Sequence, residues 1–178
     1  MADGTKRGLP SAAEWIGFAA LAAVVLLLYR AGGAGQGNAP VEIGLPLPEL
    51  KVAGWINSDG LGRDELAGRV VVIDCWATWC GPCVASLPTL SAIHQQYGPM
   101  GVQFIGLTDE TGESMIEAFL SKRDGVDWPI GYGAAPTSMD LGITTIPTLI
   151  AYDKSGRVAW SGHNPAELRS VLDRLVLQ

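Results

Sequence analysis

The hydrophobic positions of the chain follow two different periods. Continuous apolar runs predict buried strands at 69–76 and 102–107, while apolar residues at three- and four-residue spacing predict helices over 80–97 and 113–122. A strand–helix–strand–helix order implies parallel strands joined by right-handed crossovers. The pattern therefore predicts an α/β fold.

The C-terminal part has a different pattern. Two apolar segments within 148–160 are separated by an Asp-Lys-Ser-Gly turn, which predicts a hairpin. Asn164 followed by Pro165 is typical of a helix start, and we expect a closing helix there. The stretch from Asp127 onward is expected to be irregular. Shorter elements are expected at 50–53 (an edge strand), 63–66 (one helical turn) and 135–141 (a short helix).

Residues 12–29 form an apolar segment of a third kind, without a polar stripe. At a rise of about 1.5 Å per residue it would span roughly 27 Å, close to the thickness of a bilayer core. Trp15 and Tyr29 bracket the segment, as interfacial aromatic residues do. We expect a transmembrane anchor at 12–30. A cleaved signal peptide is the alternative, because the run is short and small residues follow it.

This anchor would divide the chain into four parts. Residues 1–11, which are slightly basic, are expected in the cytoplasm, and everything after the anchor outside it. The Gly/Ala-rich stretch 31–43 is expected to be a flexible linker, followed by one domain over 44–178. The expected localisation is therefore a single-pass membrane protein with an extracytoplasmic, periplasmic domain.

Composition narrows the possible functions further. The chain has 178 residues, 48% of them hydrophobic, which is enough for the core of one domain. Its formal net charge is −6. We therefore expect no nucleic-acid partner, because phosphate binding requires a basic surface.

The candidate chemistry lies at Cys80-Gly81-Pro82-Cys83, where a predicted strand meets a predicted helix. There, Cys80 would face unpaired backbone N–H groups and the positive end of the helix dipole, which stabilise a thiolate. A thiolate attacks disulfides, and Cys83 is one turn away, close enough to resolve a mixed disulfide. The pattern predicts a two-electron redox pair.

Other uses of two close cysteines remain open. A zinc site needs four ligands, and the chain adds only Cys75, His94 and His163, so no metal site is expected. A purely structural disulfide would close a very small loop and stabilise little. A soft-metal module that delivers copper is the alternative function, because thiolate pairs favour Cu(I). A thiol peroxidase is the third, although the Thr and Arg that activate peroxide are not recognisable.

Residues 74–83 resemble the active-site stretch of the thioredoxin family, and residues 142–148 resemble its cis-proline loop. With the anchor and the extended segment before the first core strand, the chain is similar to the extracytoplasmic TlpA/ResA-like branch. The resemblance covers about 44–178. It implies a thioredoxin fold, with a central mixed sheet flanked by helices and preceded by the transmembrane helix.

The resemblance also implies residue roles. Cys80 would be the exposed nucleophile, Cys83 the buried resolving thiol, and Pro147 the cis-proline beside the disulfide. Ile146 would offer its backbone to an extended substrate strand. No cofactor other than the redox-active disulfide is implied. The remaining residues expected at the substrate surface are Trp79, Gly81, Pro82 and Thr145.

Asp74 is a carboxylate inside an apolar strand, where burial costs several kcal/mol unless the group is neutralised or bonded. Burial raises the pKa of such a group. In thioredoxin this position holds the acid that exchanges a proton with the resolving cysteine, and the same is expected for Asp74 and Cys83. A hydrogen bond to nearby backbone is the alternative.

Two positions depart from the branch pattern. Ser86 stands where an acid often lies, and Cys75 stands at a usually aromatic position. We expect Cys75 to be a buried, structural thiol on the opposite sheet face from Asp74. The acidic residues Asp109, Glu110 and Glu113 are expected to be solvated, and His163 to be a surface residue.

The resemblance implies a thiol–disulfide oxidoreductase that acts mainly as a reductant, because Gly81-Pro82 and Ile146 match thioredoxin. Its expected substrates are disulfide-containing exported proteins, including the cysteine pairs of haem-attachment sites in cytochrome c maturation. The expected partner is a membrane electron-transfer protein that reduces thiols. The membrane itself would be bound through the N-terminal helix.

Overall fold

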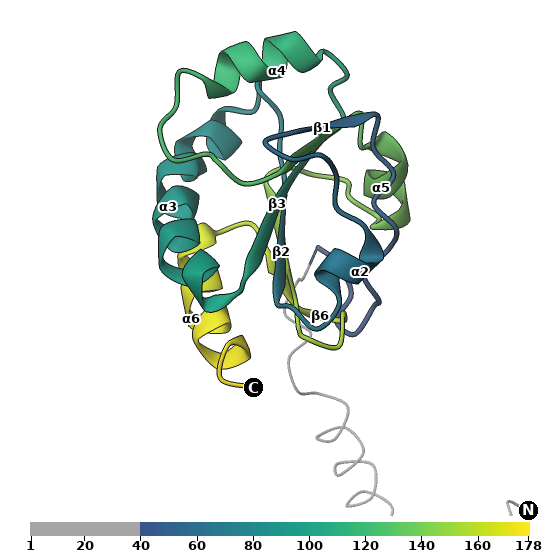
Figure 1. Cartoon of the computed structure of the whole chain (residues 1–178), viewed down its shortest axis with the longest axis vertical. Helices are drawn as coiled ribbons and strands as arrows, with labels where there is room; N and C mark the ends of the chain where they lie inside the picture. Colours follow the sequence, from purple (N-terminus) through teal and green to yellow (C-terminus); the bar gives the residue numbers. More distant parts are fainter. Residues whose placement is uncertain (1–39) are drawn as a thin grey trace, which may run out of the picture. The chain divides into compact units, whose positions relative to one another are not determined.

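The computed structural model describes residues 40–178, which form a six-stranded sheet with helices on both sides (Figure 1). The predicted anchor at 12–30 lies outside the described residues. Within 40–178, no helix is both long and apolar enough to cross a membrane. The spatial order of the strands is β1 (Gly54–Ile56), β4 (Ile130–Tyr132), β3 (Gln103–Thr108), β2 (Val71–Cys75), β5 (Thr148–Tyr152) and β6 (Val158–Gly162).

The sheet is mixed. Strands β2, β3 and β4 run parallel, while β1, β5 and β6 pair antiparallel to their neighbours. The helices are α2 (Arg63–Leu66), α3 (Gly81–Tyr97), α4 (Glu113–Leu120), α5 (Ala135–Asp140) and α6 (Pro165–Leu175), with a 3-10 turn at Gly98–Met100.

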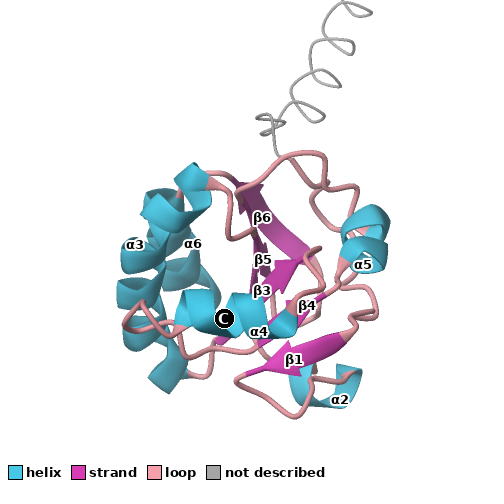
Figure 2. Cartoon of the chain, turned by 90° about the horizontal axis from the view of Figure 1, so that it is seen from above, coloured by secondary structure: helices cyan, strands magenta, loops and turns pink. Residues whose placement is uncertain are grey.

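Two hydrophobic clusters fill the two faces of the sheet. Helices α3 and α6 pack on one face, together with the buried side of α4, while α2 and the ends of α5 contribute to the other (Figures 1 and 2). Along β2 and the residues that flank it, residues 70, 72 and 76 belong to the first cluster, and residues 71, 73 and 75 to the second. This alternation is what a strand buried on both faces requires.

Four connecting segments meet where one set of strand ends lies. Strands β2 and β3 end there because they are parallel, and β5 begins there because it runs antiparallel to β2. Strand β6 also ends there, because it runs antiparallel to β5. Segments that follow or precede these strands therefore meet, although they are far apart in the sequence.

The longer predicted elements are confirmed, and two short strands differ from the prediction. The edge strand is β1 at Gly54–Ile56 rather than 50–53, and the stretch expected to be irregular after Asp127 contains β4. Both strands have three residues, and they pair with each other through Trp55 and Gly131. Strands this short carry no recognisable alternation, and the glycine in each of them weakens the sequence pattern.

The domain also begins earlier than residue 44. Val41 is buried, and its backbone N–H and C=O both bond the hydroxyl of Ser161 at 2.9 Å. The backbone N–H of Gly44 donates to Val158. Residues 41–43 therefore belong to the domain and not to the predicted linker, because the end of β6 supplies the polar partners that their backbone needs.

Candidate active site

Cys80 and Cys83 form a disulfide at the start of α3, with their Cα atoms 5.2 Å apart. A turn closed by the bond from Cys80 N–H to the Ala77 carbonyl joins β2 to the helix. Cys80 is the N-cap, and its sulfur accepts the backbone N–H of Cys83 at 3.2 Å. The cysteine sulfur thus takes one of the N–H groups that an α-helix leaves unpaired at its start, as the sequence predicts.

Cys80 is less accessible than the resemblance implies. The residue is only 5% exposed in this oxidised form, and Cys83 is 1% exposed. Both belong to the hydrophobic cluster that also contains Trp76. Trp79, in contrast, is 74% exposed. A large indole beside the disulfide is therefore available for contact with another molecule, while the disulfide itself is covered.

Asp74 is buried in β2, on the sheet face of Trp76 and of the cluster that contains the disulfide. Its Oδ1 has no hydrogen-bond partner among the described residues. Desolvation raises the pKa of this carboxyl to about 7. The alternative, a carboxylate fully bonded to nearby backbone, does not describe this oxygen. Asp74 can therefore gain or lose a proton near neutral pH.

The indole of Trp76 lies over Gly106 of β3, the residue that pairs with Asp74. A Cβ on Gly106 would come within 3.0 Å of Trp76 Nε1 and 2.5 Å of Ile130 Cδ1. Trp76 Nε1 is buried and has no partner among the described residues. The absence of a side chain at position 106 thus makes room for the indole beside the buried acid.

The loop before β5 contains a cis peptide bond between Ile146 and Pro147, as the resemblance implies. Because Thr148 pairs with Cys75, this loop lies against the end of β2, where the active-site turn begins. The Thr148 hydroxyl donates to the Thr145 carbonyl at 2.7 Å. Ile146 is half-buried against the cluster that contains both cysteines, while Thr145 is exposed.

His163 is exposed, as expected, but it also contacts this loop. Its Nδ1 lies 2.6 Å from the carbonyl oxygen of Pro147, so Nδ1 must carry the donated proton. Gly162 pairs with Leu149, which places His163 next to the start of β5. No feature of the sequence around His163 predicts this contact, because it depends on the register of the hairpin.

Glu110 is the clearest residue that the sequence analysis missed. It was expected to be solvated with its acidic neighbours, but it is half-buried and binds Thr78 in the active-site turn. Its Oε2 accepts the Thr78 N–H at 2.7 Å, and its Oε1 accepts the Thr78 hydroxyl at 2.6 Å. The expectation of solvation is wrong for Glu110, because the parallel pairing of β2 and β3 brings the two loops together.

Cys75 and Ser86 are the two positions that depart from the branch pattern. Cys75 is a free, buried thiol on the opposite sheet face, and burial raises its pKa. The hydroxyl of Ser86, where the related branch often has an acid, donates to the Cys83 carbonyl at 2.7 Å. Within residues 40–178, no three His, Cys, Asp or Glu side chains converge as metal ligands would.

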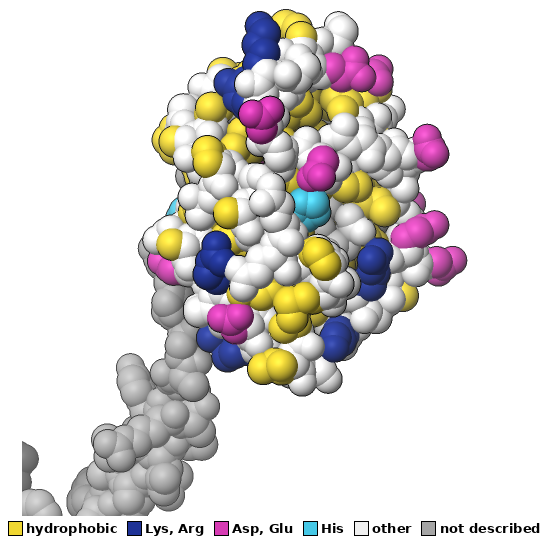
Figure 3. All heavy atoms as spheres, turned by 60° about the vertical axis from the view of Figure 1, so that its left-hand side comes forward, with side chains coloured by type: hydrophobic (Ala, Val, Ile, Leu, Met, Phe, Trp, Pro, Cys, Tyr) yellow, Lys and Arg dark blue, Asp and Glu magenta, His cyan; other side chains and the backbone are white. Residues whose placement is uncertain are grey.

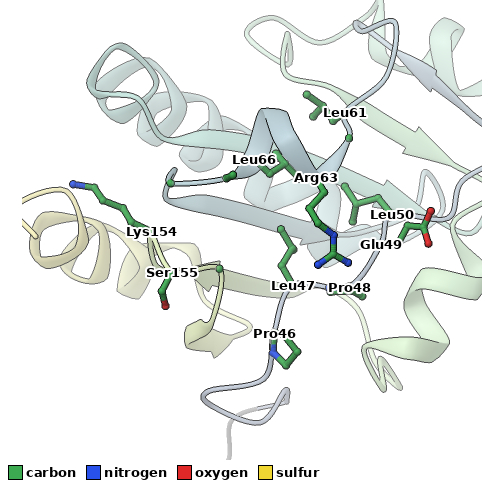
Figure 4. Close-up of a pocket in the computed structure, with 14 residues that line it drawn as sticks. Pro46, Leu47, Pro48, Glu49, Leu50, Leu61, Arg63, Leu66, Lys154 and Ser155 are labelled. Carbon is green, nitrogen blue, oxygen red and sulfur yellow. The ribbon is translucent and has the colours of Figure 1, made fainter.

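The surface adds two features. On the side that carries α3, basic side chains lie apart from one another among acidic and uncharged ones, so this face has no continuous basic surface (Figure 3). A pocket with a volume of about 750 cubic Å lies near the first residue of β2, between α2 and the β5–β6 turn, with Arg63 and Lys154 at its wall (Figure 4). This pocket is remote from the disulfide.

The sequence is similar to those of known proteins. A family model described as Redoxin matches residues 61–175. The thiol–disulfide oxidoreductase ResA of Bacillus anthracis is 25% identical over 144 residues, which cover 76% of this chain and 82% of that protein. The ResA of Halalkalibacterium halodurans is 28% identical over 104 residues, 58% of each chain.

Solved structures agree on the fold. A thioredoxin-like superfamily protein superposes with a TM-score of 0.66 at 24% identity, covering 75% of this chain and 97% of that one. A thiol–disulfide isomerase from Corynebacterium glutamicum also gives 0.66, at 25% identity and the same coverage. The domain therefore has the thioredoxin fold. Together with the paired cysteines and the family match, this establishes that the chain belongs to the redoxin family, as a ResA-like thiol–disulfide oxidoreductase.

Proposed function

We propose that the protein reduces disulfides in exported proteins, outside the cytoplasm. The direction rests on Gly81-Pro82 between the cysteines and on Ile146 before the cis-proline, which match thioredoxin, a protein of low reduction potential. The observation that supports the proposed activity is the Cys80–Cys83 disulfide at the start of α3, next to the loop that carries Pro147.

The reaction takes place in two exchanges. The Cys80 thiolate attacks one sulfur of the substrate disulfide, forms a mixed disulfide and releases the other substrate sulfur as a thiolate. Cys83 then attacks the Cys80 sulfur, which releases the second substrate thiolate and leaves the Cys80–Cys83 disulfide. Two electrons pass to the substrate. Asp74 accepts the proton of Cys83, for which a pKa of about 7 is suitable.

The substrate strand would add alongside residues 145–147. Thr145 is exposed, and the half-buried Ile146 has a peptide backbone that an extended chain can pair with. Trp79, Gly81 and Pro82, which lie before and between the two cysteines in the sequence, are also exposed. Substrate selection would then depend on backbone pairing at the loop and on apolar contact with the Trp79 indole.

The proposed place of action and partners rest on the N-terminal sequence and on the resemblance to the extracytoplasmic branch. An anchor at 12–30 would hold the domain at the outer face of the membrane. Oxidised protein must be reduced again, and a membrane thiol-reducing electron-transfer protein is the proposed donor. Exported apocytochromes c, whose haem-attachment cysteines must be reduced, are the proposed substrates.

The reduction potential of the Cys80–Cys83 couple tests the direction. We expect the full chain, equilibrated with glutathione or dithiothreitol, to give a value near −270 mV, as thioredoxins do. It should also reduce insulin disulfides, and the Cys80→Ser variant should not. A potential near −120 mV would assign the protein to oxidation instead.

A further inference from the structure

We propose that Glu110 is a positioning residue for the redox site. Its carboxylate holds the turn that presents Trp79 and Cys80, and it does so from a different strand. The turn consists of residues 77–80 and is closed by the Cys80 N–H bond to the Ala77 carbonyl. Thr78, the second residue of this turn, gives both its N–H and its hydroxyl to Glu110.

Both oxygens of the carboxylate are used. Oε1 accepts the Thr78 hydroxyl at 2.6 Å, while Oε2 accepts the Thr78 N–H at 2.7 Å and the Thr108 hydroxyl at 3.2 Å. Hydrogen bonds to a carboxylate are shorter and stronger than neutral ones. A loop residue that is held at its backbone and at its side chain has little freedom to turn.

Glu110 is itself held by the sheet. The Thr108 hydroxyl that it binds belongs to the last residue of β3 and is almost fully buried. The backbone N–H of Glu110 donates to the same hydroxyl, and its carbonyl accepts the N–H of Gly133 after β4. The acceptor is therefore fixed by β3 and β4, and the turn is positioned against it. A site supported in this way keeps its geometry better than a free loop.

Position and charge both affect the cysteine. Cys80 is two residues from Thr78, so the carboxylate lies on the order of 10 Å or less from it. Trp79, between them, is the exposed side chain beside the disulfide. Releasing the turn would displace Cys80 and Trp79 relative to a bound substrate, and a small displacement costs a large factor in rate. Removing the negative charge would also favour the Cys80 thiolate.

The test compares Glu110→Gln with the matched control Glu113→Gln in the full chain. Glu113 lies in the same segment, but its carboxylate accepts the Tyr132 hydroxyl and does not bind the turn. Glutamine cannot accept both Thr78 donors and the Thr108 hydroxyl. We expect Glu110→Gln to reduce insulin about tenfold more slowly than the unchanged protein, and Glu113→Gln to match it.

Two changes at Thr78 complete the design. Thr78→Ser keeps both donors and should retain the normal rate, while Thr78→Val removes only the hydroxyl and should give an intermediate loss. Because the residues act as one pair, Thr78→Val added to Glu110→Gln should cost little more than Glu110→Gln alone. Thr78→Val also tests the proposal if Glu110→Gln does not fold.

The alkylation rate of reduced Cys80 against pH separates positioning from folding and needs no substrate. The midpoint should fall by about half a pH unit in Glu110→Gln, the size expected for one charge at this distance, and stay unchanged in Glu113→Gln. Asp74 and His163 are the same in both variants, so neither contributes to the difference. An unchanged midpoint and rate in Glu110→Gln, or equal losses in Glu113→Gln, would overturn the proposal, whether or not insulin is a good substrate.

Discussion

At the scale of single residues, Asp74 combines two properties that conflict in a stable protein. It is 4% exposed, and its Oδ1 has no hydrogen-bond partner among the described residues. An ionised carboxylate in such a place is costly, so its pKa rises to about 7 through desolvation. Folding therefore favours the protonated acid, while the proposed reaction needs it to release and accept a proton.

This conflict predicts how stability depends on pH. The pKa of Asp74 in the folded protein lies above the usual value of 3.8, so its contribution to the free energy of unfolding is fully present below about pH 4 and is lost as pH rises to about 7. At about 1.4 kcal/mol per pKa unit, the loss is at most roughly 4–5 kcal/mol. Urea unfolding of oxidised Asp74→Asn should show a smaller decline between pH 4 and pH 8 than the unchanged protein. Parallel curves would contradict the assignment.

The same residue should also affect the rate of reduction. Asparagine cannot accept the Cys83 proton, so Asp74→Asn should slow resolution of the mixed disulfide at pH 7 by about tenfold or more. Stopped-flow reduction of a protein disulfide between pH 5 and 9 measures this. The first step, attack by Cys80, should be affected less. A pH–rate profile identical to that of the unchanged protein would remove Asp74 from the mechanism.

The sequence identifies some of these residues and not others, for a physical reason. Cys80, Cys83 and Asp74 are close along the chain, so a strand followed by a helix is enough to bring them together. Glu110 and His163 reach the site only through strand pairing, 32 residues from Thr78 and 16 from Pro147 respectively. Their residue types are common on surfaces, so nothing in the local pattern separates them from solvated side chains.

At the scale of elements, β3 has a special position because it packs against the buried acid and the indole. Gly106 pairs with Asp74, and the Trp76 ring fills the space where a side chain would stand. A glycine inside a strand weakens the strand, and it often marks a place where another group approaches the backbone closely. Here the approaching group is the Trp76 indole, which belongs to the same hydrophobic cluster as Cys80 and Cys83.

Gly106→Ala should therefore be destabilising. Its Cβ would lie 2.5 Å from Ile130 Cδ1 and 3.0 Å from Trp76 Nε1, and overpacking of this kind costs about 1–3 kcal/mol. Denaturant unfolding monitored by tryptophan fluorescence would measure the loss. Gly81→Ala is the matched control, because a Cβ there meets nothing within 4 Å. Equal stability of the two variants would show that the Ile130 and Trp76 side chains move away at no cost.

Element prediction from the sequence fails where an element is held only by its neighbours. Helix α3 can be predicted because apolar residues recur on its buried face along its 17 residues. Strand β2 can be predicted because all five of its residues are buried, which gives a nearly continuous apolar run in the sequence. Strands β1 and β4 have three residues each and exist through their pairing with each other and with β3. Such strands become recognisable only once the register of the sheet is known.

At the scale of the whole molecule, residues 41–47 pack against the end of the domain, although the sequence predicts that the first three of them belong to the linker. Val41 binds Ser161 through both backbone groups, and residues 44–47 pair with the β5–β6 hairpin. The edge strand β6 is thus covered along part of its length. Covering an edge strand prevents it from pairing with other chains, so this segment protects the β6 edge of the sheet.

Two fragments test this view of the domain. Residues 40–178 should fold, keep the Cys80–Cys83 couple and reduce insulin at the rate of the full chain, because every contact described above lies within them. Residues 48–178 lose the buried Val41 side chain and the backbone bonds of Val41, Gly44 and Leu47, a loss of several kcal/mol in total. Thermal unfolding and size-exclusion chromatography should show a lower melting temperature and self-association for 48–178 alone. If the two fragments were equally stable, residues 41–47 would have no structural role in the domain.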